Sequence, residues 1–172
     1  MHEETAVNDT LPEVTDPIEF SADELAEIDR LKGLYPSSKS AIMPVLWMAQ
    51  KKWGWLSEGV MRHVAEVLDL TYAHVYGVAS FYTMYFKKPM GRYHVQVCTN
   101  VSCMLRGGER LFDHVSKRFG IGHNGRTPDG AFSLEEVECM GACGGAPMVA
   151  LNEDYHENIT IETLDLMLDG LK

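Results

Sequence analysis

Residues 18–88 show apolar positions at the three- and four-residue spacing of amphipathic helices. Ser21 and Glu24 form a capping box before the first predicted helix, and Gly33 ends it. Three further helices are predicted from the same spacing: one over residues 40–52, one capped by Ser57, and one capped by Thr71 that reaches about residue 80. We therefore expect a small helical bundle over residues 18–88.

After residue 88 the apolar pattern changes to the alternation of strands, first between Tyr93 and Cys98. A helix is predicted over residues 108–119. The remaining predicted elements are strands over residues 132–139 and 148–152, a short strand around Tyr155, and a helix from Ile161 to about Leu168. This β, α, β, β, β, α order predicts an α+β domain over residues 89–172. Residues 1–17 are polar and acidic without a hydrophobic period, and we expect a mobile tail there.

The charge of the chain excludes one class of partner. The 172 residues include 25 Asp and Glu against 15 Lys and Arg, a formal net charge of −10. Nucleic acid is therefore not an expected partner, because the phosphates would be repelled. The longest apolar run, residues 41–49, is far shorter than the roughly 20 residues of a membrane span, so no direct membrane insertion is expected. The acidic first residues are unlike a secretory or mitochondrial leader, which favours a cytoplasmic protein.

All four cysteines lie in the second half of the chain, as two close pairs. Cys98 and Cys103 form one pair, and Cys139 and Cys143 form the other. Disulfides are rare in a reducing cytoplasm, so pairs near predicted strand ends indicate a four-thiolate metal site rather than a disulfide framework. The spacings fit zinc loosely and suit an iron–sulfur cluster better. A zinc-stabilised interaction module and a thioredoxin-like disulfide enzyme remain as alternatives, although the C-x-x-C motif of the enzyme is absent.

The residues near the cysteines narrow the class of cluster. No cysteine is followed closely by histidine, and the seven histidines show no paired metal spacing, which argues against a Rieske centre. A plant-type ferredoxin would have a third cysteine where Arg106 stands. Because a cluster with four thiolates is negatively charged, backbone amides should point toward sulfur. The candidate donors are Gly141, Gly144 and Gly145 at the second pair and Thr99, Asn100 and Ser102 at the first.

Three segments carry a resemblance to a known family: residues 75–85, 97–103 and 138–148. They are similar to the E subunit of bacterial respiratory NADH:quinone oxidoreductase (complex I), and the similarity extends from about residue 20 to the end. It implies a helical N-terminal part followed by a thioredoxin-like 2Fe-2S ferredoxin domain. The cluster ligands that it implies are Cys98, Cys103, Cys139 and Cys143.

The resemblance also implies a function and partners. The chain would be an electron-transfer subunit of the NADH dehydrogenase module, with FMN and NADH bound by a partner flavoprotein subunit and other peripheral-arm subunits nearby. It would have no catalytic residue of its own and would lie on the cytoplasmic side of the inner membrane through the complex. An equivalent subunit of an NAD-linked hydrogenase or formate dehydrogenase remains an alternative. Residues 120–125 match G-x-G-x-x-G but follow a helix and precede Pro128, so we expect a loop there.

An aromatic stretch, one proline and a small basic cluster complete the features of the sequence. The aromatic stretch from Tyr72 to Phe86 is expected to be core, with Tyr82 and Tyr85 as candidates for docking the flavoprotein. Pro147 stands where thioredoxin-like folds often keep a cis proline. Lys87, Lys88 and Arg92 are expected to form a solvated basic face.

Overall fold

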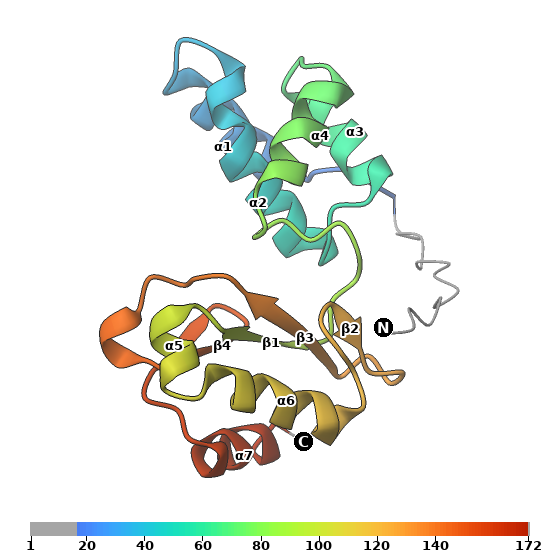
Figure 1. Cartoon of the computed structure of the whole chain (residues 1–172). Helices are drawn as coiled ribbons and strands as arrows, with labels where there is room; N and C mark the ends of the chain where they lie inside the picture. The colour runs from blue at the N-terminus through green and yellow to red at the C-terminus, as the bar shows by residue number, and fades with distance from the viewer. Residues whose placement is uncertain (1–16, 172) are drawn as a thin grey trace. The chain divides into compact units, whose positions relative to one another are not determined.

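The computed structural model describes residues 17–171. The chain divides into two compact units, Met1–Pro89 and Met90–Lys172, which are described separately (Figure 1). All but the last residue of the expected tail over residues 1–17 lies outside the described residues. No helix among residues 17–171 is long and apolar enough to cross a bilayer.

The N-terminal unit is helical. Ser21 caps its first helix through a complete capping box, and the hydroxyls of Ser57 and Thr71 accept hydrogen bonds from the backbone amides of the helices that they precede. The elements are α1 (Ala22–Gly33), the 3-10 helix η1 (Ser38–Ala41), α2 (Ile42–Trp53), α3 (Glu58–Val67) and α4 (Tyr72–Phe81). The helix predicted over residues 40–52 is therefore a 3-10 turn followed by α2. Pro44 lies in the first turn of α2, where a missing amide costs no helical hydrogen bond.

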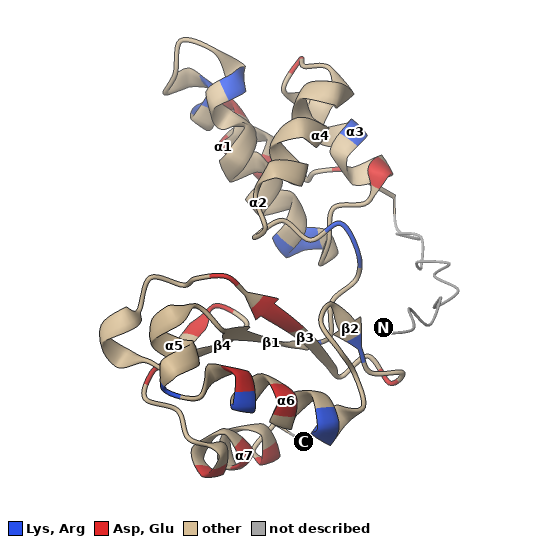
Figure 2. Ribbon diagram, viewed as in Figure 1, with Lys and Arg blue, Asp and Glu red and all other residues tan. Residues whose placement is uncertain are grey.

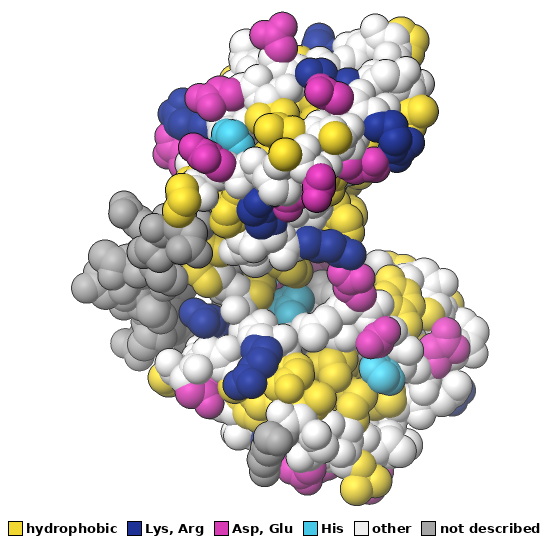
Figure 3. All heavy atoms as spheres, turned by 180° about the vertical axis from the view of Figure 1, so that it is seen from behind, with side chains coloured by type: hydrophobic (Ala, Val, Ile, Leu, Met, Phe, Trp, Pro, Cys, Tyr) yellow, Lys and Arg dark blue, Asp and Glu magenta, His cyan; other side chains and the backbone are white. Residues whose placement is uncertain are grey.

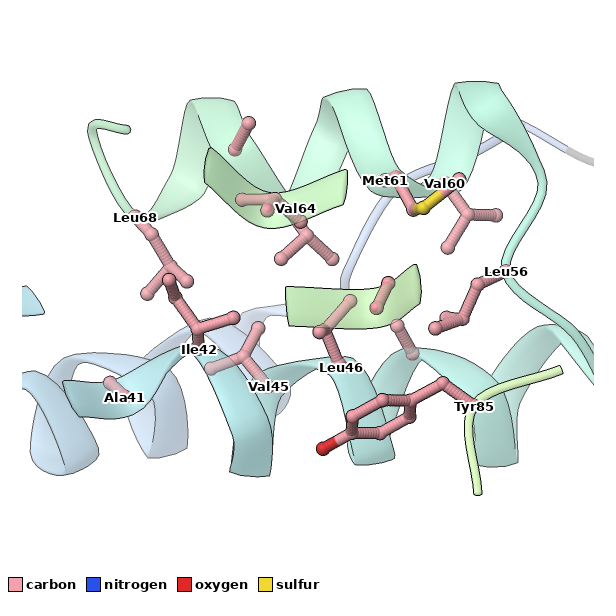
Figure 4. Close-up of a cluster of buried hydrophobic side chains, with 14 of the residues drawn as sticks. Ala41, Ile42, Val45, Leu46, Leu56, Val60, Met61, Val64, Leu68 and Tyr85 are labelled. Atoms are coloured by element: carbon pink, nitrogen blue, oxygen red, sulfur yellow. The ribbon is translucent and has the colours of Figure 1, made fainter. Parts of the chain in front are cut away.

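The apolar faces of α2 and α3 point toward one another and form the core of this unit (Figure 4). Val45 and Leu46 of α2, like Val60 and Val64 of α3, are completely buried. Burying each such side chain stabilises the fold by about 1.5–3 kcal/mol relative to its exposure. Tyr85 is also buried, and its hydroxyl donates a hydrogen bond of 2.8 Å to the carbonyl of Met43.

The C-terminal unit is a mixed five-stranded sheet in the order β2-β3-β1-β4-β5. The pair β1–β3 is parallel and the other pairs are antiparallel. The strands are β1 (Tyr93–Cys98), β2 (Gly125–Arg126), β3 (Phe132–Val137), β4 (Val149–Leu151) and β5 (Asp154–His156). The helical elements are α5 (Val101–Leu105), α6 (Gly108–Phe119), the 3-10 helix η2 (Cys143–Gly145) and α7 (Ile161–Asp169).

Helices α6 and α7 cover one face of the sheet (Figure 1). Their buried side chains, including Leu111 and Leu164, pack with Val95 and Val97 of β1 in the core of this unit. Because side chains alternate along β1, Val95 and Val97 lie against the helices. Cys98 lies at the end of this buried strand. Hydrophobic side chains also reach the surface of each unit among charged ones (Figure 3).

The structure corrects the predicted elements at three places, which are α5, β2 and the end of β3. Helix α5 and strand β2 were not predicted, because five and two residues are too short to show a period. The strand predicted over residues 132–139 ends at Val137, so Cys139 lies in the loop that follows. The loop expected over residues 120–125 is observed for residues 120–124, which connect α6 to β2, whereas Gly125 begins β2. Gly120 ends α6 in the left-handed region with a φ of 67°.

Candidate metal centre

The first cysteine pair lies at the junction of a strand and a helix. Cys98 ends β1 and Cys103 lies in α5, and both are buried, with 3% and 2% of their surface exposed. The turn between the two cysteines is short. The Thr99 amide donates a hydrogen bond to the carbonyl of Val137 in the neighbouring strand, and the side chain of the next residue, Asn100, already caps α5. The sheet and the cap together hold two thiols beside each other inside the protein.

The surroundings of Cys103 determine its protonation. Burial raises the pKa of the Cys103 thiol, and the nearby thiols of Cys98 and Cys143 act in the same direction, whereas a hydrogen bond from the Met148 amide opposes them. A raised pKa keeps this thiol neutral until a metal displaces its proton. The structure thus brings Cys98, Cys103 and Cys143 close enough to interact.

The second pair lies in the loop between β3 and β4. Cys139 and Cys143 are both exposed, and Cys143 begins η2. The Gly141 amide donates a hydrogen bond of 3.3 Å to Sγ of Cys139. Gly141 has a φ of 75°, a conformation that glycine adopts without the steric cost of a side chain. The exposed pair is therefore placed by a tight loop and the short 3-10 helix η2 rather than by a strand or an α-helix.

The end of this loop is anchored to the rest of the unit. The Asn158 amide donates to the carbonyl of Gly145 at 2.7 Å, and the Ile159 amide donates to the carbonyl of Pro147 at 3.1 Å. The Ala146–Pro147 peptide is cis. Ala146 and Met148 then pack with the buried cysteines in a small cluster of their own. These contacts keep Met148 in place to donate to Cys103.

Gly108 allows α6 to begin beside the first pair. A Cβ at this position would lie 2.5 Å from the carbonyl oxygen of Cys98 and 3.1 Å from the backbone of Cys103. Only glycine fits this close approach of two backbones.

The donor set fits an all-thiolate cluster. Among residues 17–171, no three His, Cys, Asp or Glu side chains are positioned to hold one metal ion together. A two-iron cluster takes two thiolates at each iron, and the buried pair of Cys98 and Cys103 supplies such a set. Amides that point at sulfur, from Gly141 and Met148, suit the negative charge that bound thiolates would carry.

The expected amide donors are only partly those observed. Gly141 points its amide at sulfur as expected, but the amide of Thr99 bonds within the sheet and that of Gly145 bonds to the Ala142 carbonyl. The donor from Met148 was missed, because a backbone amide leaves no signal in the sequence. One residue in the sequence could have predicted helix α5, because Asn100 is of a type that is favoured at the N-cap of a helix.

A family model described as "Thioredoxin-like [2Fe-2S] ferredoxin" matches residues 28–172. The chain belongs to this family. Its curated relatives include an E subunit of NADH-quinone oxidoreductase from Rhizobium meliloti (strain 1021), 44% identical over 85% of this chain and 87% of that protein. The corresponding protein of Rickettsia bellii (strain RML369-C) is 43% identical over 86% of this chain and 89% of that protein. These matches confirm the family resemblance and the 2Fe-2S cofactor class.

A solved structure supports the ferredoxin fold. The protein described as "NAD+-reducing [NiFe]-hydrogenase in the air-oxidized state" matches with a TM-score of 0.65 over 74% of this chain and 22% of that chain. The sequence identity is 20%, so this match carries the fold alone. The α+β, thioredoxin-like fold class is confirmed.

Proposed function

We propose that this protein is the electron-transfer subunit of the NADH dehydrogenase module of respiratory complex I, carrying one 2Fe-2S cluster next to the FMN of a partner flavoprotein subunit. The observation that carries the proposal is a pair of buried thiols in a chain of the thioredoxin-like ferredoxin family. The relatives of this chain are named as E subunits of NADH-quinone oxidoreductase. Through the complex, the protein lies on the cytoplasmic side of the inner membrane, beside other peripheral-arm subunits.

The four cysteines are the proposed ligands. Cys98 and Cys103 hold one iron, and Cys139 and Cys143 hold the other. When bound, such a cluster accepts one electron and returns it. The buried pair excludes water from one side of the site, and the amides of Gly141 and Met148 offset negative charge on sulfur. These residues bind and tune the cluster, and none of them touches a substrate.

The hydride chemistry is assigned to the partner. In this chain the glycine-rich segment 120–125 runs from the end of α6 into the first residue of β2, and it does not open a helix after a strand, as a dinucleotide site requires. NADH and FMN therefore bind to the flavoprotein subunit, and this chain carries single electrons.

Anaerobic purification of the tagged full-length chain from its own organism tests this function. We expect a red-brown protein with iron and acid-labile sulfide in equal amounts, a paramagnetic signal after reduction with dithionite, and a co-purifying flavoprotein in an assembly that reduces quinone. Bound zinc without a redox signal would overturn the proposal in favour of a structural zinc module. Co-purification with a hydrogenase or formate dehydrogenase subunit would assign the chain to the related enzymes.

A further inference from the structure

The two cysteine segments are almost free of charge. Residues 98–108 contain one charged side chain, Arg106, and residues 139–152 contain none, although 23% of the chain is charged. Figure 2 shows this contrast, since α5 is uniformly uncharged while α6 carries several charged positions. The centre of a protein interface is depleted of charged residues in the same way.

Helix α5 also exposes apolar side chains beside the buried thiols. Val101, Met104 and Leu105 are 58%, 42% and 77% exposed, and their spacing places them on one side of the helix. Cys103 lies on the other, buried side. Three exposed apolar residues in a five-residue helix form a patch, which is a feature of interaction sites rather than of ordinary surface.

Two arginines border this patch. Arg106 and Arg110 line a cavity of about 340 Å³ whose other walls include Pro147, Thr160 and Glu162. Arg110 folds back over Gly107, where a Cβ would lie 2.8 Å from its Nη2 atom. Among the described residues neither arginine forms an ion pair, whereas Arg118 of the same helical region pairs with Asp165 and Asp169.

We propose that the α5 patch (Val101, Met104 and Leu105) together with Arg106 and Arg110 is the docking surface for the flavin-bearing partner. The inference rests on the proposed function, because a subunit that exchanges electrons with a flavin must bring its cluster close to the partner. The partner meets this surface with apolar side chains edged by carboxylates, which pair with the two arginines. A symmetric contact between two copies of this chain would place the same uncompensated cations opposite one another, so a partner with acidic residues fits better.

Two test variants, each with a control variant, probe the surface. All are made in the full chain and expressed in its own organism. Leu105→Asp alters the patch, and Leu166→Asp is its control, because Leu166 is 74% exposed on α7. The double variant R106E/R110E alters the basic edge, and Lys117→Glu, an exposed residue of α6, is the charge control. The readouts are flavin and iron recovered per tagged chain after purification.

We expect Leu105→Asp and R106E/R110E each to reduce the recovered flavin about tenfold or more, as loss of an interface anchor does. Iron should stay at the wild-type level, and both controls should keep their flavin.

Unchanged flavin recovery in both test variants would overturn the inference. So would iron loss in parallel with flavin loss, which would make these residues part of the cluster site. A change from dimer to monomer with flavin retained would identify the patch as a contact between copies and contradict the inference. If the wild-type chain itself recovers no flavin, the proposed function fails before the variants are compared.

Discussion

The two cysteine pairs that are proposed to hold the cluster are positioned in different ways. Cys98 and Cys103 are buried at the junction of β1 and α5, whereas Cys139 and Cys143 are exposed in a glycine-rich loop. The first pair is positioned by the sheet, a helix cap and the backbone contact at Gly108. The second pair is positioned by a turn and a few backbone hydrogen bonds. Half of the proposed site therefore belongs to the folded core and half to the surface, so substitutions in the two halves should differ in their effect on the stability of the metal-free protein.

The largest expected difference in stability comes from the glycines beside each pair. Gly108→Ala places a methyl group against the backbone of Cys98 and Cys103, and we expect a loss of about 1–3 kcal/mol in the free energy of unfolding. Gly144→Ala meets open space and should cost much less. Chemical denaturation of both metal-free variants measures the contrast. Equal losses would show that the first pair is no more tightly packed than the second.

The thiols themselves provide the next comparison. Cys103→Ser buries a hydroxyl in an apolar cluster and should destabilise the metal-free protein by about 2 kcal/mol. Cys139→Ser changes an exposed residue and should stay within about 0.5 kcal/mol. Thermal unfolding of the two proteins gives the answer, and a destabilised Cys139→Ser would contradict the assignment of this residue to the surface half.

The sheet that carries the first pair should respond to acid. Burial would raise the pKa of Glu135, but hydrogen bonds from His94 and Gln96 outweigh it and lower the pKa below the ordinary 4.5. This carboxylate therefore contributes stability above about pH 4.5, and the contribution is lost as the pH falls through the lowered pKa of the folded state. Glu135→Gln should cost about 1–2 kcal/mol at pH 7 and show a weaker acid dependence than wild type. Identical dependence of stability on pH in the variant and in wild type would show that the hydrogen bonds of Glu135 between β1 and β3 do not contribute to the stability of the protein.

Among the changes expected to destabilise the protein, the smallest loss is expected at Gly141, beside the second pair. Gly141→Ala forces alanine into a left-handed conformation, at a cost of about 1 kcal/mol, and displaces the amide that points at Cys139. With the cluster bound, the reduction potential should fall, because a donor that favours the more negative reduced form is weakened. A redox titration against wild type checks this direction. An unchanged potential would exclude the Gly141 amide as a tuning group.

Particular residues explain what the sequence could and could not predict. The four longer helices of the N-terminal unit follow from full turns of apolar spacing and from caps such as Ser21, Ser57 and Thr71. The short elements do not, because β2 exists only through its pairing with β3 and α5 has too few residues to show a period. The cysteine pairs were visible in sequence, but the burial of one pair and the donor from Met148 depend on contacts between segments that are distant in the chain.

The four cysteines are proposed to hold one two-iron cluster together. The most direct measurement compares iron, acid-labile sulfide and the spectrum of the reduced protein in wild type and in the four single Cys→Ala variants at positions 98, 103, 139 and 143. We expect a full 2Fe-2S spectrum in wild type and its loss in every variant, whether the replaced thiol is buried or exposed. Retention of the full two-iron spectrum in all four variants would contradict ligation by these cysteines.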